Sequence, residues 1–222
     1  FIDKFYEYHL HDAYTFDLTE KGGTLPELPA PDPKMGKYDL VSAAIGYNVK
    51  ETPLNIVTFY NAIANNGKMM KPYLIESYEV NGEPVKEFGP EILNGSIFSK
   101  ATAATLTRAL KMVTLEGTAT RLKNAKCVVA GKTGTARTVL SPEEQPLRND
   151  PYVSVNGERK YQATFVGFFP ADEPKYTAIV VVYTNPTKGS VYGGVIPAMT
   201  FREIVDKLWS LDSTWGETFQ AR

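Results

Sequence analysis

The five residues Lys132-Thr133-Gly134-Thr135-Ala136 suit the binding of an anionic substrate along an extended strand. The two threonines favour β-structure and carry hydroxyl donors, and Gly134 has no Cβ, so a substrate backbone can lie close against the strand. Such a strand can bind a carboxylate through Lys132 and Thr135, and it can direct a backbone N–H at a developing oxyanion. The stretch therefore predicts a substrate-binding strand that needs a serine nucleophile opposite it.

A lysine three residues after a serine would mark that nucleophile, and the chain does not contain this pattern. None of its serines is followed by lysine at this spacing: Ser42, Ser77, Ser96, Ser99, Ser141, Ser154, Ser190, Ser210 and Ser213. The second element expected of such a site is Ser-x-Asn, and its one match is Ser154-Val155-Asn156. Because Asn156-Gly157 is a strong hairpin signal, we interpret this match as a turn. The sequence thus shows one half of an active site.

The Lys-Thr-Gly stretch has two other interpretations. Gly131-Lys132-Thr133 resembles the end of a phosphate-binding loop, but that loop requires a glycine at the position of Lys126. An ordinary edge strand with an exposed lysine is the other interpretation, since a three-residue match is weak when it is taken alone.

The composition is that of a folded globular chain. Of the 222 residues, 43% are hydrophobic and 22% are charged, close to globular averages. The formal net charge of -1, with no run of Lys or Arg, argues against a nucleic-acid partner. The single cysteine, Cys127, cannot form an internal disulfide, and the valines that follow it predict a buried thiol in a strand.

The chain shows neither a signal peptide nor an apolar run approaching the roughly 20 residues that span a bilayer. It begins at Phe1 rather than at a methionine. We therefore expect an excised piece of a longer protein, which agrees with the missing serine.

Helices are expected on both sides of a run of strands. Thr52 suits an N-cap, Pro53 suits the first helical position, and Gly67 ends a segment whose apolar residues recur at helical spacing. Two further helices are expected from about Ser99 to Glu116 and from about Pro197 to Trp209.

The strands are expected between these helices. Asn81-Gly82 predicts a hairpin formed by residues 73–80 and 83–88. Three further strands are expected at residues 127–138, 161–169 and 176–184. The last of them is nearly continuous in β-formers, as in a strand covered on both faces. Helices before and after consecutive strands indicate an α+β fold with an antiparallel sheet.

Residues 1–38 are expected to be an extended lead-in to this core. The opening is rich in aromatic residues, and the stretch from Gly22 to Gly36 is rich in Pro and Gly. Proline fixes φ and removes a backbone donor, so an extended surface segment is predicted.

Four stretches, in order from about residue 40 to residue 209, are similar to motifs of class B penicillin-binding proteins. They are Gly46-Tyr47-Asn48-Val49 with Thr52-Pro53-Leu54 and the helix through Ala62–Gly67, Gly117-Thr118-Ala119, Gly131–Ala136, and Tyr192-Gly193-Gly194 with Pro197 and Phe201-Arg202. The chain resembles the C-terminal part of that family's transpeptidase domain, in which a Ser-x-x-Lys motif accompanies the Lys-Thr-Gly strand. Asn48 stands where the family often has glycine. Because Ser-x-x-Lys and Ser-x-Asn come earlier in the domain, the resemblance implies a chain that begins just after Ser-x-Asn.

The resemblance implies that residues 1–222 are the C-terminal portion of one penicillin-binding, β-lactamase-like transpeptidase domain, and that the parent protein is a serine D,D-transpeptidase. Its serine would attack the D-Ala-D-Ala end of a peptidoglycan stem peptide, D-alanine would leave, and an amine of a neighbouring stem would take the acyl group. β-Lactams would imitate the substrate. The chain alone would be inactive.

The resemblance also implies residue roles. Lys132 would support proton movement and the carboxylate field. Thr133 and Thr135 would bind carboxylate, and the Thr135 N–H would supply half of the oxyanion hole. Tyr192, Gly193 and Gly194 would border the cleft, although a glycine turn before a helix also explains them.

No cofactor and no metal are implied. The expected partners are the stem peptide, β-lactams and the missing N-terminal part of the domain, and a second copy could pair with an exposed sheet edge. The resemblance places the parent protein at the periplasmic or extracytoplasmic face of the cytoplasmic membrane, anchored by an N-terminal segment outside this chain. Two alternatives stay open. One is a relative of the serine β-lactamases, although no deacylating base is evident, and the other is a non-catalytic scaffold or interaction fragment.

Three further features have plain structural interpretations. His9 and His11 would face the same way only on a strand, and two ligands without a third make a poor metal site. The loop from Val139 to Lys160 could line the cleft, but a solvated excursion is favoured. Glu143-Glu144 is followed by polar and proline residues, which indicates surface rather than a catalytic acid pair.

Overall fold

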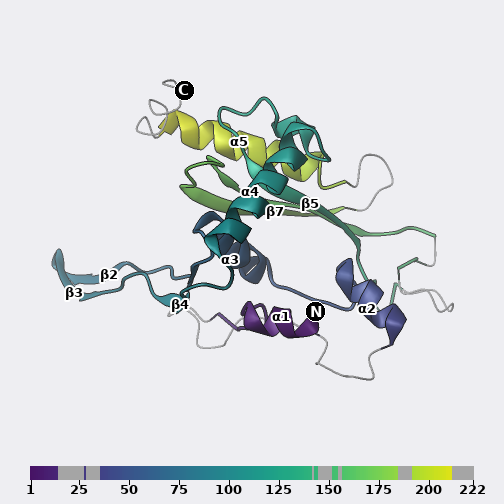
Figure 1. The fold of residues 1–222 in the computed structure, drawn as a ribbon, viewed down its shortest axis with the longest axis horizontal. Coiled ribbons are helices and arrows are strands. Elements are labelled where there is room, and N and C mark those ends of the chain that lie inside the picture. Colours follow the sequence, from purple (N-terminus) through teal and green to yellow (C-terminus); the bar gives the residue numbers. More distant parts are fainter. Residues whose placement is uncertain are drawn as a thin grey trace. The chain divides into compact units, whose positions relative to one another are not determined.

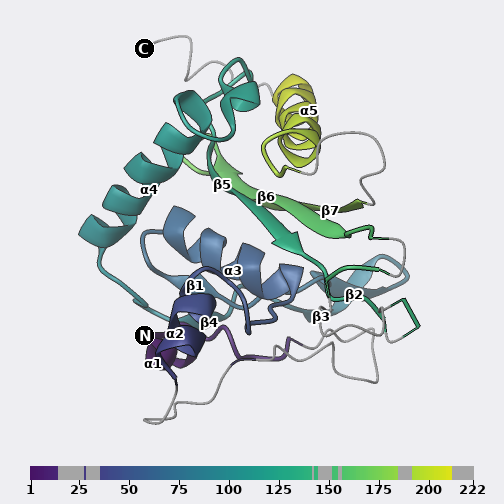
Figure 2. The same cartoon turned by 90° about the vertical axis from the view of Figure 1, so that its right-hand side faces the viewer.

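The computed structural model describes residues 1–14, 28, 36–141, 143–144, 152–154, 157–184 and 192–211 (Figures 1 and 2). Most of the Pro/Gly-rich stretch expected to be extended lies outside these residues. The chain divides into two units, Phe1–Ala103 and Ala104–Arg222.

Unit 1 contains the helices α1 (Ile2–Glu7), α2 (Lys37–Ala44) and α3 (Pro53–Ala64). The helix predicted from Thr52 is confirmed as α3. The Thr52 hydroxyl accepts a hydrogen bond from the Asn55 N–H at 3.1 Å, and Pro53 occupies the first turn. Gly67 follows the end of the helix with a φ of 91°, which a residue with a Cβ rarely adopts.

The prediction of an extended lead-in over residues 1–38 is wrong at its two ends, where α1 forms and α2 begins. Aromatic packing explains the helical opening. The rings of Phe1 and Phe5, one helical turn apart, have centroids 5.1 Å apart, and Tyr8 packs against Phe59 of α3 at 5.7 Å.

The departure from the family at Asn48 has a backbone explanation. Gly46 has a φ of 92° and Asn48 a φ of 60°, so both lie in the left-handed region. Asparagine is among the few residues with a Cβ that adopt this region readily, so it can replace a glycine there.

The strands of unit 1 form two small sheets. The predicted hairpin is present as β2 (Ser77–Val80) and β3 (Glu83–Glu87), although β2 begins later than expected. Asn81 and Gly82 both have positive φ, as a tight turn of this kind requires. The hairpin extends away from the rest of its unit (Figure 1). The second sheet, formed by β1 (Met69–Met70) and β4 (Ile92–Asn94), was not predicted, because two or three residues are too few for a periodic pattern.

Helix α4 (Lys100–Leu115) confirms the helix predicted at residues 99–116 and crosses from unit 1 into unit 2. Within unit 2 the buried hydroxyl of Thr114 donates to the Val129 carbonyl at 2.7 Å. This bond ties the end of α4 to the segment that leads into the sheet.

The sheet of unit 2 has the antiparallel order β5 (Ala130–Arg137), β6 (Tyr161–Phe169) and β7 (Tyr176–Thr184). β6 and β7 have the predicted bounds, whereas β5 begins three residues later than residue 127. Cys127 is buried as predicted but precedes the strand, and burial raises the pKa of its thiol to about 12.

The prediction that residues 176–184 are covered on both faces is wrong. Most of β7 is half-buried, and Tyr183 is 71% exposed. β6 is the most buried strand, because it has a neighbour on each side.

The core of unit 2 lies between the sheet and α5 (Ile196–Leu211), which confirms the predicted closing helix. Figure 2 shows α5 along one face of the sheet. The ring of Phe201 lies 4.8 Å from that of Phe165 and 5.5 Å from that of Phe169. Leu122, in the short helix η1 (Thr120–Leu122), and Val129 belong to the same cluster. No helix in the described residues is apolar enough over a sufficient length to cross a membrane.

Candidate functional site

β5 carries the Lys-Thr-Gly-Thr stretch at one edge of the unit 2 sheet. Its register with β6 places Thr133 opposite Phe165 and Thr135 opposite Ala163. Since side chains alternate along a strand, the two threonines share the face of Phe165, and Lys132 points to the other face. Among the described strands, β5 pairs with β6 only. Its second edge can therefore pair with an extended ligand.

Lys132 is exposed, and its ammonium group bends back over its own strand. The Nζ atom donates to the Thr133 carbonyl at 2.8 Å. A hydrogen bond at an exposed position contributes little to stability, so the ammonium can exchange this carbonyl for an anion at small cost.

The two glycines of the stretch differ in the space around them. A Cβ added at Gly131 would lie 2.5 Å from the Phe165 ring and 2.6 Å from the Val166 carbonyl oxygen. A Cβ added at Gly134 would meet only the Thr164 Cβ, at an ordinary 3.5 Å. Packing within the described structure thus requires glycine at 131 but not at 134.

Each threonine hydroxyl has a polar neighbour from another segment. The Thr133 Oγ1 atom lies 2.8 Å from the Thr118 Oγ1 atom. The Thr135 Oγ1 atom accepts a hydrogen bond from the Gly193 N–H at 3.1 Å. Segments near residues 118 and 193 therefore meet β5 at its two threonines.

The Tyr192-Gly193-Gly194 turn packs directly on the strand backbone. A Cβ at Gly193 would lie 2.3 Å from the Thr164 carbonyl oxygen and 2.5 Å from that of Gly134. The Gly193 carbonyl also accepts from the Ala198 N–H at 3.1 Å, in the first turn of α5. Tyr192 itself is 65% exposed. The structure thus brings this turn to the threonines of the strand.

Thr118 is a site residue that sequence reasoning did not identify. The sequence indicates Thr118 only as part of the stretch Gly117-Thr118-Ala119, which precedes the strand. No spacing rule relates residues 118 and 133, because their contact depends on how a loop packs against a strand.

The hydrogen bonds around Ser154 agree with the interpretation of the Ser-x-Asn match as a turn. The Gly157 N–H donates to the Ser154 carbonyl at 2.9 Å, and the Glu158 N–H donates to the Ser154 hydroxyl oxygen at 3.0 Å. Val155 and Asn156 lie outside the described residues. The Ser154 hydroxyl is therefore part of a local turn.

The loop that follows β5 is described only in part. Glu144 forms an ion pair with Lys160, which lowers the pKa of the Glu144 carboxyl, and a hydrogen bond with Ser141 lowers that of Glu143. Lowered values keep both carboxyls ionised, which agrees with the surface interpretation and not with a catalytic acid. The prediction for the rest of the loop between Val139 and Lys160 lies outside the described residues.

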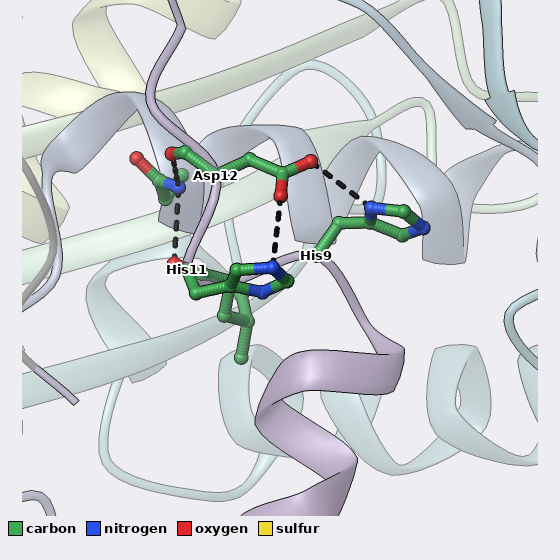
Figure 3. A network of polar contacts seen from close by, with 5 residues as sticks. His9, His11 and Asp12 are labelled. Carbon is green, nitrogen blue, oxygen red and sulfur yellow. Dashed lines mark hydrogen bonds and ion pairs between the residues drawn. The ribbon is translucent and has the colours of Figure 1, made fainter. Parts of the chain in front are cut away.

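His9 and His11 both contact the carboxylate of Asp12 in unit 1 (Figure 3). The His9 Nδ1 atom lies 3.0 Å from one oxygen and the His11 Nε2 atom 3.4 Å from the other. Each histidine thus has one nitrogen engaged with a carboxylate. In the parts of the chain that the structure describes, no group of three or more His, Cys, Asp or Glu residues is arranged to hold a metal ion.

Comparison with known proteins agrees with this geometry. A family model described as penicillin binding protein transpeptidase domain matches residues 17–206. Stage V sporulation protein D of Bacillus subtilis is 30% identical over 168 residues, which cover 74% of this chain and 24% of that protein. Peptidoglycan D,D-transpeptidase FtsI of Escherichia coli is 25% identical over 210 residues, which cover 92% of this chain and 30% of that protein.

Solved structures show the same fold. The apo transpeptidase domain of Burkholderia pseudomallei penicillin-binding protein 3 aligns with 95% of this chain and 56% of its own, with a TM-score of 0.69 and 22% identity. Penicillin-binding protein 3 from Mycobacterium tuberculosis, complexed with aztreonam, aligns with 96% of this chain and 46% of its own, with a TM-score of 0.73 and 24% identity.

The predicted α+β architecture is thus that of penicillin-binding transpeptidase domains. The chain belongs to the penicillin-binding protein transpeptidase domain family. Its matched relatives are class B penicillin-binding proteins, which confirms the resemblance, and it spans about a quarter of the length of the first of them.

Proposed function

We propose that this chain is the Lys-Thr-Gly-bearing half of a peptidoglycan D,D-transpeptidase domain that works through a serine acyl-enzyme. The observation that carries the proposal is the placement of Thr133 and Thr135 on one face of an edge strand, with their hydroxyls 2.8 Å and 3.1 Å from polar groups of two other segments. Relatives named peptidoglycan D,D-transpeptidases support it.

The proposed roles follow the chemistry of each group. The Thr133 and Thr135 hydroxyls bind the carboxylate of a stem peptide or a β-lactam, and Lys132 contributes positive charge and assists proton movement. The Thr135 N–H supplies one oxyanion donor, and loss of one such donor typically costs about 10² to 10³ in rate. Gly134, where packing does not require glycine, lets the substrate backbone approach.

The nucleophile in this proposal lies in an upstream half of the domain. This chain has no Ser-x-x-Lys, and it covers 56% of a solved transpeptidase domain. α2 exposes apolar side chains of the kind that usually pack against another part of a protein, with Tyr38 88% and Val41 58% exposed. The upstream half is therefore the principal partner in the proposal.

The proposal places the complete protein at the extracytoplasmic face of the bacterial membrane. Its relatives belong to a family of cell-wall enzymes. Peptidoglycan lies outside that membrane, so the substrate is reached only there. An anchoring segment, if present, belongs to the upstream part.

Intact-mass spectrometry after incubation with benzylpenicillin tests the proposal. This chain alone should keep its mass, while the full-length protein that contains it should gain one stoichiometric adduct. In the full-length protein, Lys132→Met should slow acylation at least about 100-fold, since it removes the cation beside the reacting groups. Lys123→Met, a matched change elsewhere in unit 2, should leave acylation unchanged.

Two results would contradict the proposal. An adduct on this chain alone would mean that one of its own serines is the nucleophile. A full-length protein that forms no adduct would favour the non-catalytic scaffold instead.

A further inference from the structure

The two threonine hydroxyls of β5 are each held by a second polar group, and these contacts determine where their hydrogens can point. Thr133 and Thr135 lie two residues apart, on the same face of the strand. A carboxylate accepts hydrogen bonds and donates none, so a hydroxyl binds it only when its hydrogen points outward.

The contact at Thr135 leaves its hydrogen free. A hydroxyl has one hydrogen and two acceptor lone pairs. The Gly193 N–H donates to the Thr135 Oγ1 atom at 3.1 Å, so a lone pair faces Gly193. The hydroxyl hydrogen must then point away from Gly193, in a direction in which a ligand can accept it.

The contact at Thr133 has two possible directions. With 2.8 Å between the Oγ1 atoms of Thr118 and Thr133, either hydroxyl can donate. When Thr118 donates, the hydrogen of Thr133 is available to a ligand. A carboxylate favours this direction, because consecutive hydrogen bonds polarise one another and an ionised acceptor strengthens the last of them.

Close backbone packing fixes both supporting groups. A Cβ at Gly193 would lie 3.1 Å from the Gly134 nitrogen, and a Cβ at Gly194 would lie 2.0 Å from the Thr118 carbonyl oxygen. The two segments therefore pack against each other as well as against the strand. Neither can shift without displacing the other, which limits reorganisation when a ligand binds.

We propose that Thr118 and the Gly193 N–H are positioning groups, which orient the hydroxyls of Thr133 and Thr135 so that both donate to a ligand carboxylate. This inference rests on the proposed function. It adds Thr118, which acts through Thr133 and does not touch the ligand.

The test compares benzylpenicillin with its methyl ester, which lacks the carboxylate, in the full-length protein. The second-order rate constant of acylation is measured for each compound, and their ratio gives the preference for the acid. Thr118→Val should lower this ratio about 3- to 10-fold, the effect of one hydrogen bond, while the rate with the ester stays within about twofold. Thr118→Ser keeps the hydroxyl and should restore the ratio.

A double-mutant cycle separates positioning from direct contact. If Thr118 acts through Thr133, then Thr118→Val should cause no further loss of the ratio in a Thr133→Val background. Multiplying losses would overturn the proposal, because Thr118 would then bind the carboxylate itself. An unchanged ratio in Thr118→Val, or equal slowing of the acid and the ester, would also overturn it.

The wild-type measurement distinguishes this inference from the proposed function. A wild-type protein that reacts with neither compound, or equally with both, would overturn the proposed carboxylate site and this inference with it. A wild-type preference for the acid that Thr118→Val leaves intact would overturn only the positioning role.

Discussion

At the scale of single residues, the two glycines of β5 differ in whether packing requires them. Gly131 lies against the Phe165 ring and the Val166 carbonyl, and a Cβ there would come within 2.6 Å of both. Gly134 has room for a methyl group, with its nearest neighbour at 3.5 Å. Packing thus explains glycine at position 131, whereas at position 134 the proposed approach of a substrate would explain it.

Gly131→Ala and Gly134→Ala should therefore affect different properties, the first stability and the second acylation. Gly131→Ala should lower the free energy of unfolding of unit 2 by about 1–3 kcal/mol through overpacking. Gly134→Ala should leave stability within about 0.5 kcal/mol and instead slow β-lactam acylation of the full-length protein. Urea denaturation followed by tryptophan fluorescence, with acylation rates measured on the same variants, checks both. Normal acylation of Gly134→Ala would show that no ligand approaches this position closely.

Glu51 is a second residue with an unusual environment. Both of its carboxylate oxygens are buried and have no hydrogen-bond partner in the structure. Burial raises the pKa of the carboxyl from 4.5 to about 7. The folded state therefore binds a proton more tightly than the unfolded state does.

The stability of unit 1 should consequently fall as the pH rises. The contribution of protonated Glu51 is fully present below pH 4.5 and is lost as the pH rises through about 7. Allowing for partial exposure, the loss should be on the order of 1 kcal/mol. Hydrogen exchange of α3 amides between pH 5 and pH 8, corrected for intrinsic rates, measures it. Glu51→Gln cannot ionise and should flatten the dependence, so an equal slope in this variant would exclude Glu51 as its origin.

At the scale of elements, Asn55 joins α3 to the segment that follows α1. Its side chain is 2% exposed, and its Nδ2 atom donates to the carbonyls of Leu10 and Asp12 at 3.1 Å and 2.8 Å. Figure 3 shows Asp12 of this segment in contact with the two histidines. One buried amide thus satisfies two backbone carbonyls of a separate segment.

Asn55→Ala should destabilise unit 1 by about 1–3 kcal/mol, because it leaves two part-buried carbonyls without this donor. Amides of residues 4–12 should lose protection from hydrogen exchange first, since the lost bonds hold that segment. Asn65→Ala, at the exposed C-cap of the same helix, is the control and should change little. Equal effects of the two substitutions would mean that the segment is held by its aromatic contacts instead.

At the scale of the whole molecule, this chain exposes surfaces of a kind that usually pack against another part of a protein. Besides the β5 edge proposed for the substrate, β7 has one unpaired edge among the described strands, and α2 exposes apolar side chains. An unpaired edge is a template for another strand. In the proposed function the free edge of β5 is left to the substrate, and the β7 edge and the α2 surface pack against the upstream half of the domain.

The isolated chain should therefore self-associate more than the full-length protein does. Sedimentation velocity at increasing concentration should show a rising weight-average mass for this chain and a constant one for the complete protein. Tyr183→Lys in the isolated chain, which places a charge at an exposed position of the edge strand β7, should reduce the association. A chain that stays monomeric at high concentration would contradict this expectation.

The sequence by itself determined most of the elements and the family. Periodicity located α3, α4, α5, β6 and β7, because their amphipathic or β-rich patterns extend over several turns or a full strand. The Asn81-Gly82 turn was predicted because its residues adopt positive φ readily. The Lys-Thr-Gly stretch and its accompanying motifs indicated the family, since they depend on residue type and order.

Only the tertiary structure decided which groups meet. The helical form of α1 depends on the contact of Tyr8 with Phe59. The weak coverage of β7 follows from its place at the edge of the described sheet. The polar neighbours of the two threonines come from segments near residues 118 and 193 that pack against the strand. These contacts join residues far apart in the chain, so no local pattern encodes them. They arise because each segment must satisfy its buried polar groups and apolar area against whichever neighbour the fold provides.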